Sequence, residues 1–381
     1  MREILDELTT WWERSETVGL ATVINTSRSA PRDPGASMVV GPEGTVHGSV
    51  SGGCVEGAVY ELAQEVMADG APVLEHYGFS DTDAFAVGLT CGGELDVFVE
   101  RVNRATFPEL SSVAEDIRSG RYVALATLVD HPDPSWRGRH LAVHPTESGA
   151  ATTGTLGSDR TDAAVSADAL GLLAAGHHGL LSYGPDGQRL GEGMRVFVQS
   201  FAPPPRMLVF GAIDFASAVA AAGSFLGYQV TVCDARAVFA TTARFPDADD
   251  VVVDWPHRYL AEESRMGRVD QRSVIAVLTH DPKFDVPLLQ VALSLPSAYI
   301  GVMGSRRTHE DRLDRLRRAG IDEAQLNRLS SPIGLDLGAR TPEETAISIA
   351  ADIIASKWGG TGLPLRATTG AIHHPMSVSR G

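Results

Sequence analysis

The chain has 381 residues, 43% of them hydrophobic, with three cysteines and a formal net charge of −16. This length allows two or three domains with sizeable cores, whereas the negative charge argues against a nucleic-acid-binding surface. Three cysteines do not make a disulfide framework. No run of about 18 apolar residues indicates a membrane span, and the charged N-terminus lacks the apolar core of a signal peptide. We therefore expect a cytoplasmic protein that binds neither nucleic acid nor a membrane.

Two stretches within residues 1–201 have the same layout. The repeated apolar segments are VGLATVIN (18–25) with VALATLVD (123–130), and ELDVFVERV (94–102) with GMRVFVQSF (193–201). Each copy predicts a helix, three strands, a long helix and a further strand. The pattern therefore indicates a duplicated α/β domain, with copies at about 1–103 and 108–201. Chance similarity of two stretches rich in small residues is the alternative, and the shared order of the blocks favours duplication.

The first copy carries a cysteine where a strand runs into a helix, in GSVSGGCVEGAVYELAQEV (48–66). The apolar residues after Cys54 recur with helical spacing. Ser51 is a candidate N-cap, which places Cys54 in the first helical turn. Backbone N–H groups and the helix dipole favour a thiolate there, and a thiolate is a nucleophile or a ligand for a soft metal. Gly52 and Gly53 leave room for a ligand to approach the backbone.

The second copy provides an internal comparison for this thiol. It has GSDR (157–160) where the first copy has SGGC (51–54), so Arg160 takes the place of Cys54. A thiol that served only to fill the core would be expected to have a small apolar replacement. The comparison therefore favours a functional role for Cys54, with buried packing as the alternative.

The other two cysteines lie in different settings. Cys91 lies in a glycine-rich turn with Gly92 and Gly93, and both a functional and a packing role stay open, since a free cysteine commonly packs as a small hydrophobe. Cys233 ends the strand VTVC, where core packing is favoured.

A zinc site is the rival explanation for Cys54 and Cys91. Neither has a second cysteine or a histidine beside it at ligand spacing.

The pattern changes after a proline-rich linker at 202–206. Beyond it, apolar strands alternate with helices, and the last helix has a capping box that begins at Thr341. This alternation predicts a Rossmann-like domain over 206–358 with a doubly wound parallel sheet. We expect residues 359–381, rich in Gly, Thr and Ser, to form a mobile tail.

The first turn of this domain, VFGAIDFA, partly matches the dinucleotide-binding pattern. Gly211 fits, and Asp234 ends the next strand, where a ribose-binding carboxylate is expected. However, Ile213 replaces the glycine that lets the backbone approach a pyrophosphate. The pattern therefore favours a Rossmann-like fold without ordinary NAD(P) binding.

A second turn of this domain, GVMGSRR (301–307), follows a strand and precedes a helix. The amides of Gly304 and Ser305, together with Arg306, are candidates to bind a phosphate at the helix N-terminus. An ordinary strand–helix turn with solvated arginines is the alternative.

Together these motifs make the chain similar to the XdhC/CoxI family of xanthine dehydrogenase accessory proteins. The matching segments span nearly the whole chain: SAPRDPGASMVV (29–40), GSVSGGCVEGAVYE (48–61), LTCGGELDVFVE (89–100), PPPRMLVFGA (203–212), VCDAR (232–236), RFPDAD (244–249), YIGVMGSRR (299–307) and GLDLGARTPEETAISIAADI (334–353). One departure is that the family usually has a glycine in place of Ile213 and a histidine in place of Asp214. It counts against nucleotide binding by the second domain.

The resemblance implies a maturation factor that binds molybdenum cofactor, assists its sulfuration and inserts it into a xanthine dehydrogenase-type hydroxylase. It makes Cys54 the leading contact with the cofactor and its metal, and Cys91 the second. The glycines around both cysteines, together with Arg32, are expected to receive the cofactor. The implied partners are the apo-enzyme and a cysteine desulfurase, and we expect a homodimer.

Two other functions stay open at this point. One is an NAD(P)-dependent oxidoreductase that uses the second domain, against which the incomplete glycine pattern counts. The other is a thiol enzyme with Cys54 as nucleophile, for which the sequence shows no Cys/His pair. We expect a non-catalytic cofactor chaperone in preference to either enzyme.

Overall fold

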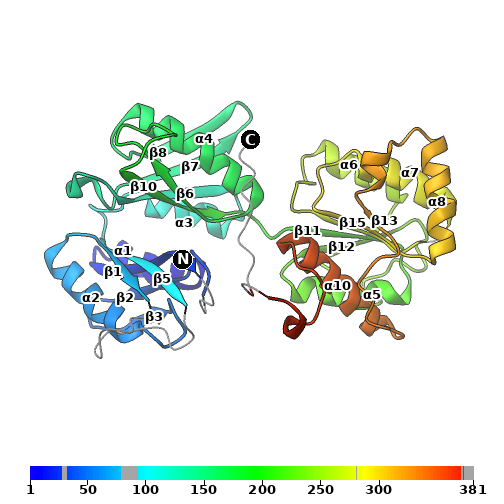
Figure 1. The fold of residues 1–381 in the computed structure, drawn as a ribbon, viewed down its shortest axis with the longest axis horizontal. Coiled ribbons are helices and arrows are strands. Elements are labelled where there is room, and N and C mark those ends of the chain that lie inside the picture. Colours follow the sequence, from blue (N-terminus) through cyan, green and yellow to red (C-terminus); the bar gives the residue numbers. More distant parts are fainter. Residues whose placement is uncertain (28–31, 79–92, 280, 370–371, 373–381) are drawn as a thin grey trace. The chain divides into compact units, whose positions relative to one another are not determined.

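The structure is a computed structural model that describes residues 1–27, 32–78, 93–279, 281–369 and 372 (Figure 1). The chain divides into two compact units, one that extends to Pro203 and one that begins at Pro204. Among the described residues, no helix is both long enough and apolar enough to cross a membrane.

The N-terminal unit consists of two antiparallel sheets, each with five strands in the described ranges. The first half contains η1 (Arg2–Ile4), α1 (Leu5–Glu13), β1 (Val18–Ser27), β2 (Ser37–Val40), β3 (Val46–Gly48), α2 (Glu56–Asp69), β4 (Val73–Tyr77) and β5 (Glu94–Val102). The second half contains α3 (Leu110–Arg118), β6 (Val123–Asp130), η2 (Pro134–Trp136), β7 (His140–Thr146), β8 (Gly149–Gly154), α4 (Asp159–Ala175), β9 (Gly179–Tyr183) and β10 (Met194–Phe201). The strand orders are β3-β2-β1-β5-β4 and β8-β7-β6-β10-β9, so the two halves share one topology.

This shared topology confirms the duplicated α/β fold, and it extends to single glycines. Gly48 and Gly154 end β3 and β8 with φ of 79° and 85°, and Gly70 and Gly176 end α2 and α4 with φ of 78° and 71°. Both pairs are 106 residues apart. The predicted order of elements was wrong in one respect, because each half has an additional edge strand, β4 or β9. These strands are short and largely half-exposed, so their apolar alternation is weak.

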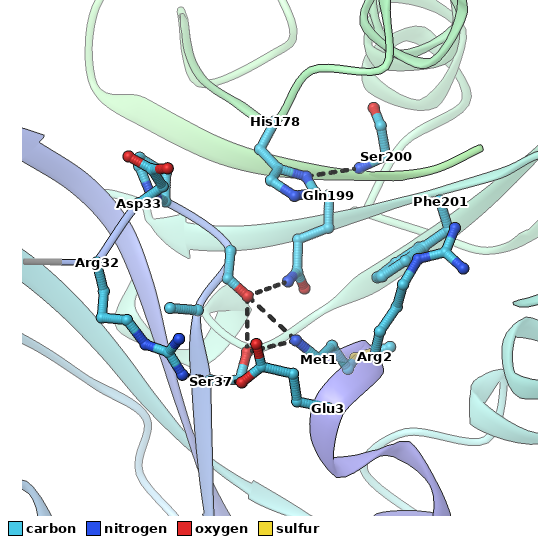
Figure 2. Close-up of a pocket in the computed structure, with 13 residues that line it drawn as sticks. Met1, Arg2, Glu3, Arg32, Asp33, Ser37, His178, Gln199, Ser200 and Phe201 are labelled. Atoms are coloured by element: carbon cyan, nitrogen blue, oxygen red, sulfur yellow. Dashed lines mark hydrogen bonds and ion pairs between the residues drawn. The ribbon is translucent and has the colours of Figure 1, made fainter. Parts of the chain in front are cut away.

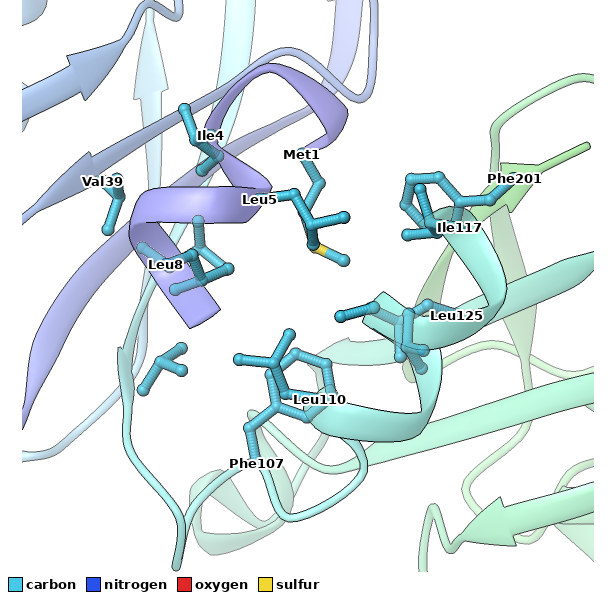
Figure 3. Packing of buried hydrophobic residues seen from close by; sticks show 14 of the residues in the cluster. Met1, Ile4, Leu5, Leu8, Val39, Phe107, Leu110, Ile117, Leu125 and Phe201 are labelled. Atoms are coloured by element: carbon cyan, nitrogen blue, oxygen red, sulfur yellow. The ribbon is translucent and has the colours of Figure 1, made fainter. Parts of the chain in front are cut away.

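A buried apolar cluster joins the two halves (Figure 3). Leu5 and Leu8 of α1 contribute to it from the first half, and Leu110 of α3 and Leu125 of β6 contribute from the second half. On the other face of the first sheet, α2 is held by its own buried stripe, which includes Val59. Burying a side chain of this size contributes about 1.5–3 kcal/mol. This packing fixes α2 on the first sheet, together with the loop that precedes it.

The C-terminal unit is a Rossmann-like domain, as predicted. It contains β11 (Arg206–Phe210), α5 (Asp214–Phe225), β12 (Gln229–Asp234), β13 (Asp250–Val253), α6 (Pro256–Arg265), β14 (Val274–Val277), α7 (Pro282–Leu293), β15 (Tyr299–Val302), α8 (Arg306–Arg318), α9 (Glu323–Leu326), β16 (Leu329–Ser330) and α10 (Pro342–Trp358). All of its paired strands are parallel, in the order β13-β12-β11-β14-β15-β16. This order is that of a doubly wound dinucleotide-binding fold.

Two apolar clusters cover the faces of this parallel sheet. One contains residues of α5 and α10, and the other contains residues of α6, α7 and α8. The predicted capping box at the start of α10 is confirmed, since Thr341 accepts from the N–H of Glu344 and the Glu344 carboxylate accepts in return. After α10, the structure describes residues 359–369, with η3 (Leu365–Ala367), and residue 372. The remainder of the predicted tail lies outside the described residues.

Candidate functional site

Cys54 lies in the loop between β3 and α2, and not in the first turn of α2 as predicted. Gly52 and Gly53 have φ of 76° and 121°, which interrupts the helical path, so α2 begins only at Glu56. Ser51 still caps this segment, because its Oγ accepts hydrogen bonds from the N–H groups of Cys54 (2.9 Å) and Val55 (3.0 Å). The Cys54 side chain is half-buried and packs against the cluster under α2.

The carboxylate of Glu56 holds this loop together. It accepts hydrogen bonds from Ser49 Oγ (2.7 Å), from Ser51 N–H (2.9 Å) and Oγ (2.5 Å), and from Gly53 N–H (2.8 Å). Burial raises the pKa of Glu56, but the hydrogen bonds from Ser49 and Ser51 outweigh it and lower the pKa to about 2. The N–H groups of this loop therefore already have acceptors, which are the Glu56 carboxylate and the hydroxyls of Ser49 and Ser51. The thiol of Cys54 is then the soft ligand that this loop can offer.

The glycines beside Cys54 leave this loop open. A Cβ added at Gly52 or Gly53 would meet no heavy atom within 4 Å in the described part of the chain. Both glycines are exposed. The described part of the chain therefore leaves space on the backbone next to Cys54.

The second half of the unit repeats the braced loop without the thiol. Asp162 accepts hydrogen bonds from Thr155 Oγ1 (2.7 Å) and from the N–H of Leu156 (2.8 Å). Asp162 and Thr155 stand 106 residues after Glu56 and Ser49, and the exposed Arg160 stands at the position of Cys54. The carboxylate brace is thus common to both halves, whereas Cys54 precedes α2 and Arg160 lies in the first turn of α4.

Arg32 lines a cavity of the same unit (Figure 2). The cavity has a volume of about 420 Å³ and is lined by residues 1–3, 32–37, 178 and 199–201. The Arg32 guanidinium pairs with Glu3 at 2.8 Å. Its Nε is buried and has no hydrogen-bond acceptor among the described residues. Cys54, which the sequence motif placed in one candidate site with Arg32, is not among the residues that line this cavity.

Two side chains of the second half complete this cavity. The Nδ1 atom of His178 accepts the N–H of Ser200 at 3.0 Å, which leaves the ring hydrogen of the neutral form on Nε2. Burial lowers the pKa of His178 to about 4, so the ring is neutral at pH 7. Gln199 is 3% exposed, and its amide donates a long hydrogen bond of 3.4 Å to the carbonyl of Gly35.

In the C-terminal unit, Asp234 is occupied by other groups. It accepts hydrogen bonds from the N–H of Ala212 (2.8 Å) and from Nε (2.9 Å) and Nη2 (2.7 Å) of Arg236. Burial raises its pKa, but the hydrogen bonds from Arg236 and Ala212 outweigh burial, and the net pKa is lowered. Asp234 and Ile213 line a cavity of about 150 Å³. The carboxylate that the motif assigns to a ribose is therefore paired with Arg236.

Gly211 serves the packing of the C-terminal unit. It has φ of 110°, and a Cβ added there would lie 2.9 Å from the backbone nitrogen of Thr279. Only glycine fits this close approach.

The phosphate-binding candidates at α8 lie apart from both cavities. Ser305 is the N-cap of α8, and its Oγ accepts the N–H of Thr308 at 3.1 Å. Gly304 precedes it with φ of 151°, and Arg306 is exposed. These contacts are those of an ordinary capped turn.

The remaining predicted residues divide between the core and the part outside the described ranges. Gly93 is buried directly before β5, whereas Cys91 and Gly92 lie outside the described residues. Cys233 is 1% exposed in the core of the C-terminal unit, and burial raises the pKa of its thiol to about 12. Within the described ranges, no group of three or more His, Cys, Asp or Glu side chains is placed to hold a metal ion.

Sequence reasoning missed Glu56, His178 and Gln199. Glu56 had a usable signal, because a carboxylate recurs at position 162 of the second copy. His178 and Gln199 had none, since they reach the cavity from a distant part of the chain and follow no motif.

Comparison with known proteins gives matches over both units. Residues 207–353 match the XdhC Rossmann domain, and residues 11–78 and 116–184 match the XdhC and CoxI family. A relative from Bacillus subtilis, described as a probable xanthine dehydrogenase subunit, is 26% identical over 358 residues, covering 91% of this chain and 94% of the relative. The molybdenum cofactor insertion chaperone PaoD of Escherichia coli is 25% identical over 334 residues, covering 88% of this chain and 81% of the relative.

A solved structure supports the fold. The crystal structure of a xanthine dehydrogenase from Bacillus halodurans matches with a TM-score of 0.62 and 24% identity, covering 92% of this chain and 95% of that chain. Together, the two family matches account for most of both units. The chain therefore belongs to the XdhC and CoxI family.

Proposed function

We propose that this protein binds molybdenum cofactor as cargo, assists its sulfuration, and inserts it into a xanthine dehydrogenase-type molybdenum hydroxylase. Family membership and the functions of the two relatives support this role. The observation that carries the proposal is the loop of Cys54. A thiol stands on a braced, open glycine loop in one half of the unit, and an exposed arginine replaces it in the other half.

The chemistry of the loop suits the metal end of this cargo. Thiolate sulfur is a soft ligand that binds molybdenum well, and the space beside Gly52 and Gly53 admits a bulky group. A single protein thiol with an otherwise open loop also suits release, because few contacts must break at transfer. Cys91 is the second proposed contact, and Arg32 is proposed to neutralise the phosphate of the pterin.

The proposal assigns no catalytic step to this chain and no NAD(P) to its C-terminal unit. Ile213 stands where a pyrophosphate would approach, and Asp234 is paired with Arg236. The proposed partners are the apo-hydroxylase, which receives the cargo, and a cysteine desulfurase, which supplies sulfur. A second copy of the chain in a homodimer is part of the same proposal.

The test is a transfer experiment. Protein purified anaerobically from cofactor-replete cells is mixed with cofactor-free xanthine dehydrogenase-type hydroxylase, and molybdenum in the re-isolated hydroxylase is measured by mass spectrometry. We expect molybdenum to move from the wild-type protein and not from Cys54→Ser. Lys283→Gln, a substitution in the other unit, is the control and should transfer normally. Equal transfer from Cys54→Ser, or none from wild-type protein that holds molybdenum, would contradict the proposal.

A further inference from the structure

We propose that the cavity lined by Arg32, His178 and Gln199 binds the pterin ring of the cargo whose molybdenum end Cys54 binds. This inference rests on the proposed function and assigns a site to a second part of the same ligand. The cavity volume of about 420 Å³ lies in the range of small-molecule sites.

Donors and acceptors in the cavity match those of a pterin. The pyrimidine part of a pterin presents N–H donors beside a carbonyl acceptor. Gln199 offers both an amide donor and an amide oxygen, whereas the carbonyl of Gly35 already accepts hydrogen bonds from the Met1 amine and from Ser37 Oγ, both at 3.1 Å. Figure 2 shows Gln199 at this cavity together with Met1 and Ser37. Because the Gln199 bond to Gly35 is long at 3.4 Å, a ligand that takes the Gln199 amide donor replaces little.

His178 adds a neutral donor to the cavity. Its Nδ1 is engaged by Ser200, so Nε2 carries the ring hydrogen. The Nε2 edge lies against Gly35, where an added Cβ would be 2.8 Å away. The glycine thus makes space for the imidazole. A neutral imidazole suits an uncharged ring better than a phosphate, which favours the pterin ring over an inorganic anion at this position.

The cavity also offers an apolar side and one unsatisfied cation. Pro34 and Ala36 lie along it, beside Phe201, which is 2% exposed and whose ring lies 5.8 Å from the Arg2 guanidinium. Arg32 contributes an Nε–H without an acceptor among the described residues. Its partner Glu3 has a side chain that is 64% exposed, so this ion pair is weak. The guanidinium can therefore turn to the phosphate that a molybdopterin carries.

The cavity and the Cys54 loop meet at one hydrogen bond. Ser37 lines the cavity, and its carbonyl accepts the N–H of Ser49 at 3.2 Å. Ser49 in turn donates to Glu56, which braces the loop of Cys54. These hydrogen bonds connect the lining of the cavity to the loop of Cys54. The cavity of the C-terminal unit has about 150 Å³, and its cations Arg236 and Lys283 are each paired with an aspartate.

The experiment uses 6-hydroxymethylpterin, which is fluorescent and lacks both metal and phosphate, titrated with the full-length protein. We expect Gln199→Leu to weaken binding about tenfold, since the loss of one to two hydrogen bonds is worth about this factor. Lys283→Gln, a substitution in the other unit, is the control and should leave the binding of this probe unchanged. Arg32→Gln and Gln199→Leu should each lower the molybdenum cofactor that the purified protein retains.

The possible outcomes separate this inference from the proposed function. If Gln199→Leu binds the pterin as well as the wild type does, or if the wild type shows no binding at millimolar probe, the cavity assignment is overturned. Loss of molybdenum in Cys54→Ser would still support the chaperone in that case. If Gln199→Leu does not fold, His178→Asn takes its place. Asparagine keeps a hydrogen-bond donor at this position but cannot place it where the imidazole does. Unchanged pterin binding by His178→Asn would again overturn the assignment.

Discussion

Replacing Glu56 with glutamine tests whether this carboxylate holds the Cys54 loop in place. The carboxylate accepts four hydrogen bonds, and a glutamine has only one oxygen to accept them. We expect about two of the four bonds to be lost. At about 1 kcal/mol each for a partly exposed group, Glu56→Gln should lower the free energy of unfolding of the N-terminal unit by about 2 kcal/mol. For a unit of this size, that corresponds to a fall in Tm of about 4–8 °C.

The pH dependence of this effect has a defined sign. The pKa of Glu56 is depressed to about 2 in the folded state, and its contribution is present in full only above the unfolded pKa of about 4.3. It is lost as the pH falls towards the folded pKa. The difference in unfolding free energy between wild type and Glu56→Gln should therefore narrow by about half from pH 6 to pH 3. A difference that stays constant over this range would refute the reasoning.

Asp162→Asn provides the matched control in the second half of the unit. The Asp162 carboxylate accepts two hydrogen bonds. Its replacement by an amide should lower the free energy of unfolding by about 1 kcal/mol. Alkylation of Cys54, followed by peptide mass spectrometry, distinguishes the two variants. We expect Glu56→Gln to alkylate faster, because the half-buried thiol is released, and Asp162→Asn to alkylate at the wild-type rate. Equal rates in all three proteins would show that Glu56 does not position the thiol.

Three further substitutions or reactions test the structure around the site. Gly48→Ala should lower the free energy of unfolding by more than about 2 kcal/mol in chemical denaturation, because the added Cβ would lie 2.2 Å from a backbone oxygen of β2. Gly52→Ala places its Cβ near no other atom, so it should lower the free energy of unfolding by only about 1 kcal/mol, through its positive φ. Cys233 should resist iodoacetamide at pH 8 until the protein unfolds, since burial raises its pKa to about 12; modification of folded protein would contradict this. Leu8 is fully buried in the core, so Leu8→Ala should lower the free energy of unfolding by about 2–5 kcal/mol. Leu190 is fully exposed, so Leu190→Ala should lower it by less than about 0.5 kcal/mol.

The fold was predictable from sequence because its signals are local or repeated. The two copies share apolar runs in the same order, and the strands and helices after residue 206 alternate with the period of a doubly wound sheet. Elements without such signals were missed. Strand β4 has one fully buried side chain, and the four-residue strand β13 has none, so neither shows a distinct apolar alternation. These short strands are stabilised by pairing with neighbouring strands, and the residues of the strand alone do not predict that pairing.

The site was predictable only in part, for the same reason. Cys54 stands out because it is a rare residue in a glycine-rich turn, and the second copy lacks it. Its position before α2, and the brace by Glu56, depend on two positive φ angles and a set of side-chain bonds. The cavity of Arg32 and Gln199 joins residues 167 positions apart. Asp234 was assigned to a ribose by its place in the sheet, whereas the local pairing with Arg236 is set by side-chain geometry.

The most direct test of the central claim is the molybdenum content of protein purified anaerobically from cofactor-replete cells, measured by mass spectrometry for the wild type, Cys54→Ser and Arg160→Ser. Arg160→Ser changes the equivalent position of the second half, which lies in the first turn of α4, and serves as the matched control. We expect molybdenum in the wild type and in Arg160→Ser, and a loss of at least tenfold in Cys54→Ser. Equal molybdenum in all three proteins would contradict the assignment of Cys54 as the metal contact, and no molybdenum in any of them would contradict the cargo itself.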